Sequence, residues 1–253
     1  MFDGYTFIRL YDFVCNAILT FNAQDPPRSV GELPSAINMS EGYTFTTSPA
    51  IEKHITRIRA QLTNDAAKFE YRAFEIPTIN RNLFSLHKCP PNSGVQLAIQ
   101  LAARRYWGHN PISIEPISQN HFRNGRIDLN LTVRPPIAAF CAAAADRQPP
   151  TAELRKLFFD AARTHASNVA TVSRGHSFDR HFFALQSAVR DGETMPALFT
   201  DSLYRSRKLP PQLMTNCLAA AALEGGDVFD HPNGMSINFQ TQEKLLVVPF
   251  PLP

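Results

Sequence analysis

The chain of 253 residues has few cysteines, and none of them lies in a metal-binding or redox motif. The four lie far apart and form no C-x-x-C pair: Cys15, Cys89, Cys141 and Cys217. Isolated cysteines argue against a zinc site and against a disulfide framework, so we expect buried, reduced thiols. No uninterrupted apolar stretch reaches the roughly 18 residues of a membrane-spanning helix, and we expect no transmembrane segment.

Charge and short motifs are sparse as well. The formal net charge is only +3 and evenly spread, which argues against nucleic acid as a partner but leaves room for a local basic patch that binds a phosphate ligand. No P-loop, G-x-G-x-x-G turn, H-E-x-x-H pair or G-x-S-x-G elbow occurs. We also find no targeting signal: no basic or Arg/Ser-rich leader, and no final S-K-L.

A composition of 44% hydrophobic and 19% charged residues is that of a globular protein with one large domain or two small ones. Residues 5–21 fit a helix, and the turn-forming residues 22–35 mark a boundary. A second helix begins at Ser48, which can cap it, and Pro49, which suits a first helical position. Its apolar stripe is Ile51, Ile55, Ile58 and Leu62.

The rest of the chain mixes predicted helices and strands without an internal repeat. Residues 75–93 contain Pro77, Pro90 and Pro91, and we interpret them as a loop. Residues 94–107 are apolar on nearly every side, which predicts a mostly buried helix that ends at Gly108. Further patterns predict strands at 112–118, 126–133, 235–239 and 244–250, and helices at 135–147, 151–172 and 177–189.

The segment SFDRHFFALQSAV, residues 177–189, places three ionisable side chains together where a helix begins: Asp179, Arg180 and His181. Ser177 can cap this helix, and its first turn favours the anionic Asp179. We expect its stripe to be buried: Phe178, Phe182, Leu185 and Val189. Arg180 lies off that stripe, so its side chain either faces solvent or reaches a ligand.

Five strings, in one order across nearly the whole chain, resemble motifs of the carnitine and choline acyltransferases. They are FDGYTFIRLYDFV, VQLAIQLAARRYWG, HFRNGRIDLNLTVRPP, GHSFDRHFFALQ and LEGGDVFDHPNGMSINF. His165 also stands on a predicted helix that carries a His at this spacing in the carnitine palmitoyltransferases. Five collinear matches argue against chance, and the palmitoyltransferases of the mitochondrial inner membrane look most similar.

The resemblance implies both a fold and a reaction. The fold is α/β, a chloramphenicol-acetyltransferase-like domain with a mixed β-sheet flanked by helices. Residues 1–32 would be the tail end of an N-terminal domain, and residues 33–253 the C-terminal acyltransferase domain. The reaction is acyl transfer between acyl-CoA and carnitine in mitochondrial fatty-acid metabolism. Coenzyme A enters as a thioester substrate, and no metal or other cofactor is implied.

The family's general base is the His of an H-x-x-x-D-G motif. Asp3 and Gly4 match the end of that motif, so the His would fall before Met1, and none of the eight histidines present follows the motif. We therefore expect a missing N-terminal half and a chain that is inactive alone. The alternative is a catalytically dead module that binds CoA, an acyl chain or another protein.

The positions that the resemblance assigns to carnitine are altered. Arg180 matches the arginine that assists binding of the carnitine carboxylate. The family's Tyr aligns with Ile114, and its Thr aligns with Ile127 or, after an insertion, with one of the residues up to Leu131. None of these carries a hydroxyl. Two further arginines, Arg126 and Arg134, are expected to form structural ion pairs.

The oxyanion and CoA positions are altered too. The family's S-T-S aligns with Met214, Thr215 and Asn216. Met214 replaces the first Ser, and Asn216 replaces the last Ser, which is the oxyanion donor. An Asn amide can still donate a hydrogen bond. The lysine pair expected to hold the CoA 3'-phosphate is reduced to Arg81 and Lys88, and Asn92 replaces an Asp. A structural role is the alternative for each: a strand-end turn for Asn216, and solvation for the two cations.

Overall fold

The computed structural model describes residues 4–24, 45–67, 73–146, 151–206, 211–217, 234–241 and 245–251. The chain forms two compact units, residues 1–69 with 219–224 and residues 70–218 with 225–253. The first unit contains α1 (Gly4–Gln24) and α2 (Pro49–Ala66), as the sequence predicts. Ser48 caps α2 by accepting a hydrogen bond from the Ile51 N–H at 3.3 Å. The predicted domain boundary after residue 32 lies outside the described residues.

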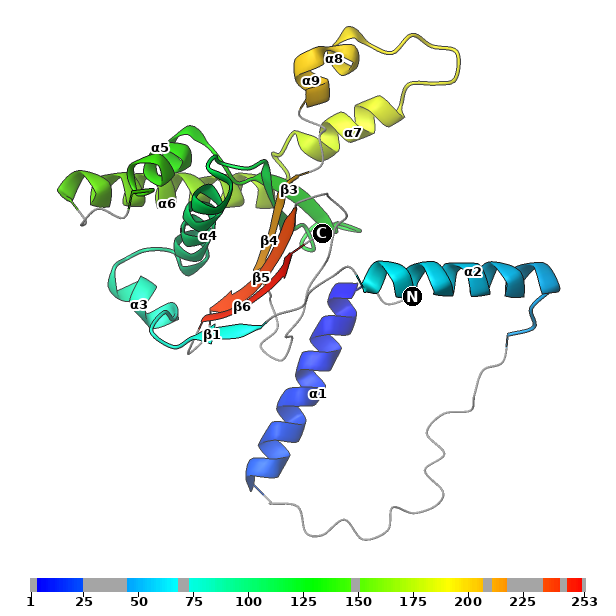
Figure 1. The fold of residues 1–253 in the computed structure, drawn as a ribbon, viewed down its shortest axis with the longest axis horizontal. Helices are drawn as coiled ribbons and strands as arrows, with labels where there is room; N and C mark the ends of the chain where they lie inside the picture. Colours follow the sequence, from blue (N-terminus) through cyan, green and yellow to red (C-terminus); the bar gives the residue numbers. More distant parts are fainter. Residues whose placement is uncertain are drawn as a thin grey trace. The chain divides into compact units, whose positions relative to one another are not determined.

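The second unit is built on a six-stranded mixed sheet in the order β1-β6-β5-β4-β2-β3 (Figure 1). Its strands are β1 (Phe74–Ile76), β2 (Ser113–Ser118), β3 (Ile127–Leu131), β4 (Leu213–Cys217), β5 (Met235–Thr241) and β6 (Leu245–Pro251). β4 runs parallel to β2 and to β5, and the other neighbours are antiparallel. The predicted α/β class with a mixed sheet is confirmed.

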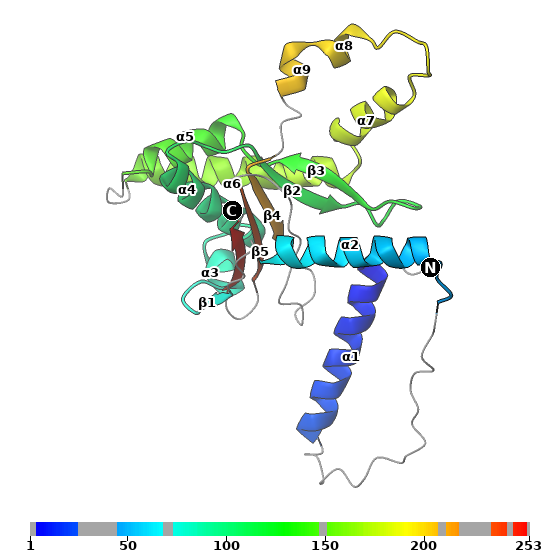
Figure 2. The same ribbon diagram turned by 45° about the vertical axis from the view of Figure 1, so that its right-hand side comes forward.

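Helices α4 (Pro91–Trp107), α5 (Pro135–Ala143) and α6 (Ala152–Ser173) gather on one face of this sheet (Figures 1 and 2). Two apolar clusters hold them there. One lies among the helices and includes Leu97, Ile137 and Ala161. The other joins α4 to the sheet through Val95, Ile99, Leu213 and Phe239. These clusters form because each helix turns its short apolar side chains inward.

The interpretation of residues 75–93 as a loop is wrong, because this segment contains β1, α3 (Arg81–Leu86) and the start of α4. The prolines stand where regular structure tolerates them: Pro77 follows β1, and Pro91 occupies the first turn of α4. Asn80 caps α3 by accepting from the Leu83 N–H at 2.9 Å. The end of α4 is as predicted, since Gly108 adopts the left-handed conformation, with φ 76°.

The predicted helix at 177–189 exists as α7 (Asp179–Ser187), but its predicted buried stripe is wrong because none of its described residues is fully buried. Leu185 is 44% exposed. Val189 lies beyond the end of the helix. The helix packs instead through Phe182 against two short helices, α8 (Ala197–Thr200) and α9 (Ser202–Ser206). The ring of Phe182 lies 6.4 Å from that of Phe199 and 6.0 Å from that of Tyr204.

The N-cap residue of α7 is Phe178, one position after the predicted Ser177. The Ser177 hydroxyl still accepts a hydrogen bond from the Asp179 N–H of the first turn at 3.5 Å. The same hydroxyl donates to the Leu129 carbonyl at 3.3 Å and so ties the start of α7 to β3. The cysteine prediction holds for two of four residues: Cys89 and Cys141 are buried, whereas Cys15 is half-buried and Cys217 exposed, and all four thiols are free.

Candidate functional site

The residues of the sheet that the resemblance assigns to carnitine binding and to the oxyanion lie on one of its faces. β2 and β4 are parallel, with Ile114 directly opposite Met214. Asn216 lies two residues further along β4 and therefore projects from the same face as Met214. Ile127 of β3 pairs with Ser118, which is four residues after Ile114, so Ile127 shares that face as well. The structure thus brings Ile114, Met214 and Asn216 together and sets Ile127 at the far end of the β2–β3 pair.

This face is the opposite one to the face that packs against α4, which carries Leu213 and Phe239. Met214 is buried, Ile114 and Asn216 are half-buried, and Ile127 is 46% exposed. The row formed by Ile114 and Met214 offers only apolar atoms, and the next row offers the Asn216 amide. Asn216 lies within β4, so the strand-end turn considered for it does not occur.

Sequence reasoning missed Asn238, which is the register partner of Asn216 on the neighbouring strand β5. Asn238 is completely buried, and within the part of the chain that the structure describes neither its Nδ2 nor its Oδ1 has a hydrogen-bond partner. A buried unpaired amide costs about 1–3 kcal/mol and calls for an explanation. Asn238 lies in the alternating segment MSINF, and this alternation, considered together with Asn216, is the signal that could have revealed Asn238.

Arg180 lies in the first turn of α7, where its side chain is exposed. It forms no hydrogen bond or ion pair with any residue that the structure describes. His181 beside it is exposed, and Asp179 is half-buried. The ion pairs expected for Arg126 and Arg134 are not found among the described residues; Arg126 is exposed, and Arg134 is the N-cap residue of α5.

The three predicted CoA-binding residues do not share one environment. Arg81 begins α3 and Lys88 follows its end, and both side chains are exposed. Lys88 adopts a left-handed backbone conformation, with φ 53°. Asn92 lies in the first turn of α4 and turns inward, because its Nδ2 donates to Oε1 of Glu115 at 2.8 Å. Two cations therefore stay at the surface, while Asn92 joins an interior network.

That network is a buried polar cluster on the α4 face of the sheet, which the sequence did not reveal. Oε2 of Glu115 lies 2.9 Å from Nε2 of His165 on α6. Nδ1 of the same ring lies 3.0 Å from Oγ of Ser93 on α4. Asn130, opposite Glu115 on β3, donates to Oε2 at 3.1 Å. All four side chains are 1% exposed, so the cluster is sealed from solvent.

Burial disfavours the ionised form of Glu115, but three partners outweigh it. His165 supplies a hydrogen bond and an electrostatic attraction, and the amides of Asn92 and Asn130 supply further hydrogen bonds. The pKa of Glu115 consequently lies below its ordinary value of 4.5, and the side chain is a carboxylate. Ser, His and Glu follow one another as in a nucleophilic triad. Ser93 is sealed from solvent, so its hydroxyl has no access to a substrate. The cluster instead joins α4 and α6 to the sheet.

Two glutamines extend this polar contact along α4. Gln96 donates from Nε2 to Oγ1 of Thr215 at 2.9 Å, and Thr215 in turn donates to the Ile114 carbonyl at 3.3 Å. Gln100 donates from Nε2 to Oγ of Ser113 at 2.8 Å. Both glutamines are fully buried. Helix α4 is thereby hydrogen-bonded to β4, which carries Met214 and Asn216, and to β2, which carries Ile114.

The described residues hold no group of three or more side chains that could bind a metal ion. None of the helices that the structure describes is long and apolar enough to cross a membrane.

A model of the Choline/Carnitine o-acyltransferase family matches residues 1–248. This chain belongs to that family. Mouse carnitine O-palmitoyltransferase 2 is 25% identical over 251 residues, which cover 95% of this acyltransferase-family chain and 37% of the mouse protein. Human choline O-acetyltransferase is 26% identical over 179 residues, 70% of the chain and 23% of that protein.

A relative of a different kind is a highly reducing polyketide synthase, ltbA, from Aspergillus luteorubrus. It is 28% identical over 223 residues, which cover 85% of this family member but only 7% of the synthase. The chain therefore spans little more than a third of the mouse palmitoyltransferase and a small part of the synthase.

Proposed function

We propose that this chain supplies the acceptor and oxyanion side of acyl transfer from a coenzyme A thioester. The observation that carries the proposal is the register of Ile114 with Met214, with Asn216 next on the same face. The Asn216 amide occupies the position that the family resemblance gives to the oxyanion donor. A donor fixed on a strand is already oriented when charge develops on the substrate oxygen, which is what such stabilisation requires.

We further propose that the mixed sheet is the chloramphenicol-acetyltransferase-like domain of this family. Residues 33–253 would form that C-terminal domain, and residues 1–32 the tail end of the preceding one. The sheet with α4, α5 and α6 on one face supports this assignment. In this arrangement the opposite face, with Ile114 and Asn216, is the one available to substrate.

Carnitine is a poor acceptor in this proposal. The carboxylate clamp that the resemblance implies is reduced to the exposed Arg180, because Ile114 and Ile127 carry no hydroxyl. Each missing hydrogen bond to a charged group costs about 1–3 kcal/mol of binding free energy. No His of the chain follows the H-x-x-x-D-G motif, so we also expect the chain alone to transfer no acyl group to carnitine.

Calorimetry with carnitine tests the acceptor site directly. The unaltered chain should bind carnitine weakly or not at all. Ile114→Tyr combined with Ile127→Thr should tighten binding about tenfold, the effect of one regained hydrogen bond. Leu86→Tyr, at an exposed position on α3, is the matched control and should change nothing. Micromolar carnitine binding by the unaltered chain would contradict the carry-over to positions 114 and 127.

The activity assay follows release of free coenzyme A from palmitoyl-CoA, with and without carnitine. We expect no carnitine-dependent release above a control without protein. If the chain binds CoA but transfers an acyl group to none of the acceptors tested, it is better described as a non-catalytic module that binds CoA or acyl chains. Turnover that scales with the amount of chain would instead show that its own residues provide the base.

The similarity to a polyketide synthase favours a second candidate, transfer of a polyketide-type acyl chain to an acceptor without a carboxylate. The apolar Ile114 and Ile127 fit such an acceptor, since their side chains have no hydrogen-bond donor for a carboxylate. To separate the candidates, the chain is given a short β-methyl thioester as acyl donor and one acceptor at a time: a small neutral alcohol, carnitine or choline. A clear preference for neutral alcohols supports this one, and a preference for carnitine rejects it.

The proposed compartment is the mitochondrion, with a role in fatty-acid metabolism. Its support is the names of relatives alone: the mouse palmitoyltransferase and the yeast acetyltransferase are mitochondrial, whereas the human octanoyltransferase is peroxisomal. Microscopy of the tagged protein with markers of both organelles tests it, and a peroxisomal or cytosolic signal would reject it.

A further inference from the structure

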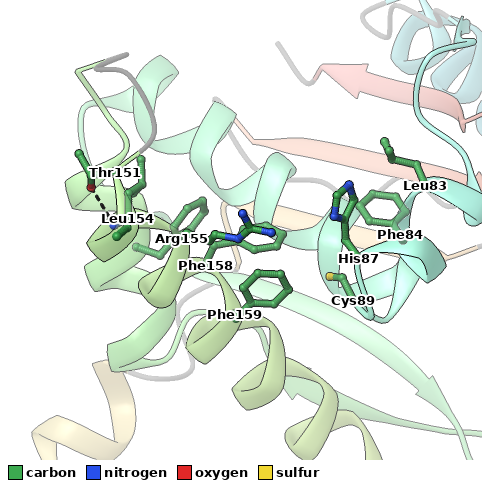
Figure 3. A pocket seen from close by; sticks show the side chains of 11 residues that line it. Leu83, Phe84, His87, Cys89, Thr151, Leu154, Arg155, Phe158 and Phe159 are labelled. Atoms are coloured by element: carbon green, nitrogen blue, oxygen red, sulfur yellow. Dashed lines mark hydrogen bonds between the residues drawn. The ribbon is translucent and has the colours of Figure 1, made fainter.

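A cavity of about 690 Å³ lies among α3, α5 and α6, away from the residues proposed to handle the acceptor (Figure 3). Its volume falls within the roughly 300–1,000 Å³ of small-molecule sites. Its walls are mainly apolar, with four phenylalanines and two leucines: Leu83, Phe84, Phe140, Leu154, Phe158 and Phe159. Such walls suit an apolar ligand or an apolar part of one.

The cavity's charge has one sign. Of the described residues, Arg155 and His87 line it, and no carboxylate does. The Cζ atom of Arg155 lies 5.9 Å from the centre of the Phe159 ring, and the guanidinium points from α6 across the cavity toward the side that carries His87 (Figure 3). Within the described part of the chain, this guanidinium has no hydrogen bond or ion pair. An exposed cation beside an apolar wall thus has no counter-ion among the residues that the structure describes.

The inner wall adds no competing charge. Cys89 lines it and is 4% exposed, and burial raises the pKa of its thiol, so the sulfur stays neutral near pH 7. Phe140 and Phe158 pack edge to face with ring centres 5.5 Å apart, which gives this wall a fixed shape. The Arg155 guanidinium offers an anion a permanent positive charge, and the phenylalanines and leucines offer its tail an apolar wall.

We propose that this cavity binds a free fatty acid, with its carboxylate on Arg155 and its alkyl chain against the phenylalanines of α5 and α6. A guanidinium is the side chain best matched to a carboxylate, because it donates two parallel hydrogen bonds. An uncharged hydrocarbon would leave Arg155 unpaired, and a compact anion without a tail would leave the apolar walls unused. The site shares no residue with the sheet face of Ile114, Met214 and Asn216, so it stands independently of the proposed acyl transfer.

The test uses the fluorescence of dansyl-labelled undecanoic acid added to the purified chain. We expect saturable binding, with dodecanoate displacing the probe and dodecanol displacing it at least fivefold less well. Arg155→Gln should weaken probe binding about fivefold, the effect of one partly exposed ion pair. Lys156→Gln removes the same charge one residue later, outside the cavity, and should bind the probe as the unaltered chain does.

A second variant tests the walls. Ala152→Trp fills the cavity from an exposed lining position, so it should abolish probe binding while leaving the unfolding temperature unchanged. Ile114→Trp, on the opposite face of the sheet, should leave binding intact. The proposal is overturned if Arg155→Gln and Ala152→Trp both bind normally, if dodecanol competes as well as dodecanoate, or if only Ile114→Trp removes binding.

Discussion

The Nε2 atom of His165 lies 2.9 Å from Oε2 of Glu115, although 50 residues separate them in the sequence. Both side chains are 1% exposed. The contact joins α6 to β2, the strand next to the edge strand β3. Removing one partner of a buried pair leaves the other without compensation, and the cost exceeds what the pair itself contributes. This contact therefore provides the most sensitive test of how the helices are held to the sheet.

Glu115→Gln should lower the free energy of unfolding by about 3–5 kcal/mol near neutral pH. The pKa of Glu115 in the folded state lies below 4.5, so its stabilising effect is present above pH 4.5 and is lost as the pH falls through that lowered pKa. Urea unfolding at several pH values should show this acid-side loss in the unaltered chain and less of it in the variant. Glu153→Gln, at an exposed position, should leave the profile unchanged.

Ser93→Ala should cost about 1–3 kcal/mol, because it leaves Nδ1 of His165 buried without a partner. In a His165→Leu background the same change should cost much less, since the atom it orphans is gone. A double-mutant cycle by urea unfolding measures this difference. Equal costs in both backgrounds would mean that the 3.0 Å contact contributes nothing. Ser187→Ala, on the exposed surface of α7, serves as the control.

Asn238→Leu should raise the free energy of unfolding by about 1–2 kcal/mol, because it replaces an unpaired buried amide with an apolar group of similar size. Asn130→Leu makes the same exchange where the amide donates to Glu115, and it should destabilise the fold. Opposite signs in thermal unfolding are the expected result. A loss of stability in both variants would show that Asn238 has a partner in the folded chain.

Gly125→Ala should destabilise the turn between β2 and β3. A Cβ at this position would lie 2.0 Å from the backbone oxygen of Gln119, and a backbone atom cannot move aside as a side chain can. We expect a cost of about 1–3 kcal/mol, typical of forced overpacking. Asn120→Ala, at an exposed position in the same turn, should be neutral. Equal unfolding temperatures for the two variants would contradict the close contact.

Local signals predicted much of the scaffold. Ser48 and Pro49 marked the start of α2, Gly108 marked the end of α4, and alternation located β5. These features depend on neighbours in the sequence, so one sequence suffices to find them. The segment 75–93 was misjudged because its prolines suggested a loop, while Asn80 was a sound cap for α3.

The site was less predictable because its partners are distant in sequence. Family resemblance singled out Ile114, Met214 and Asn216, but only the strand register shows that they share one face. Glu115 meets His165 across 50 residues, and no local pattern announces such a contact. The stripe of α7 was misjudged for the same reason, since Phe182 packs on α8 and α9, which come later in the sequence.

The hydrogen bonds of Gln96 and Gln100 have a consequence for how this protein can change. A purely apolar interface would let α4 slide along the sheet, whereas bonds to Thr215 and Ser113 allow one axial position only. Gln96 and Gln100 therefore fix the position of α4 against β4 and β2 from the face opposite to Ile114 and Met214. Replacements at positions 114, 214 or 216 change side chains on the other face and should leave these two hydrogen bonds in place. Side chains on that face can therefore change by mutation while the packing of α4 on the sheet stays the same.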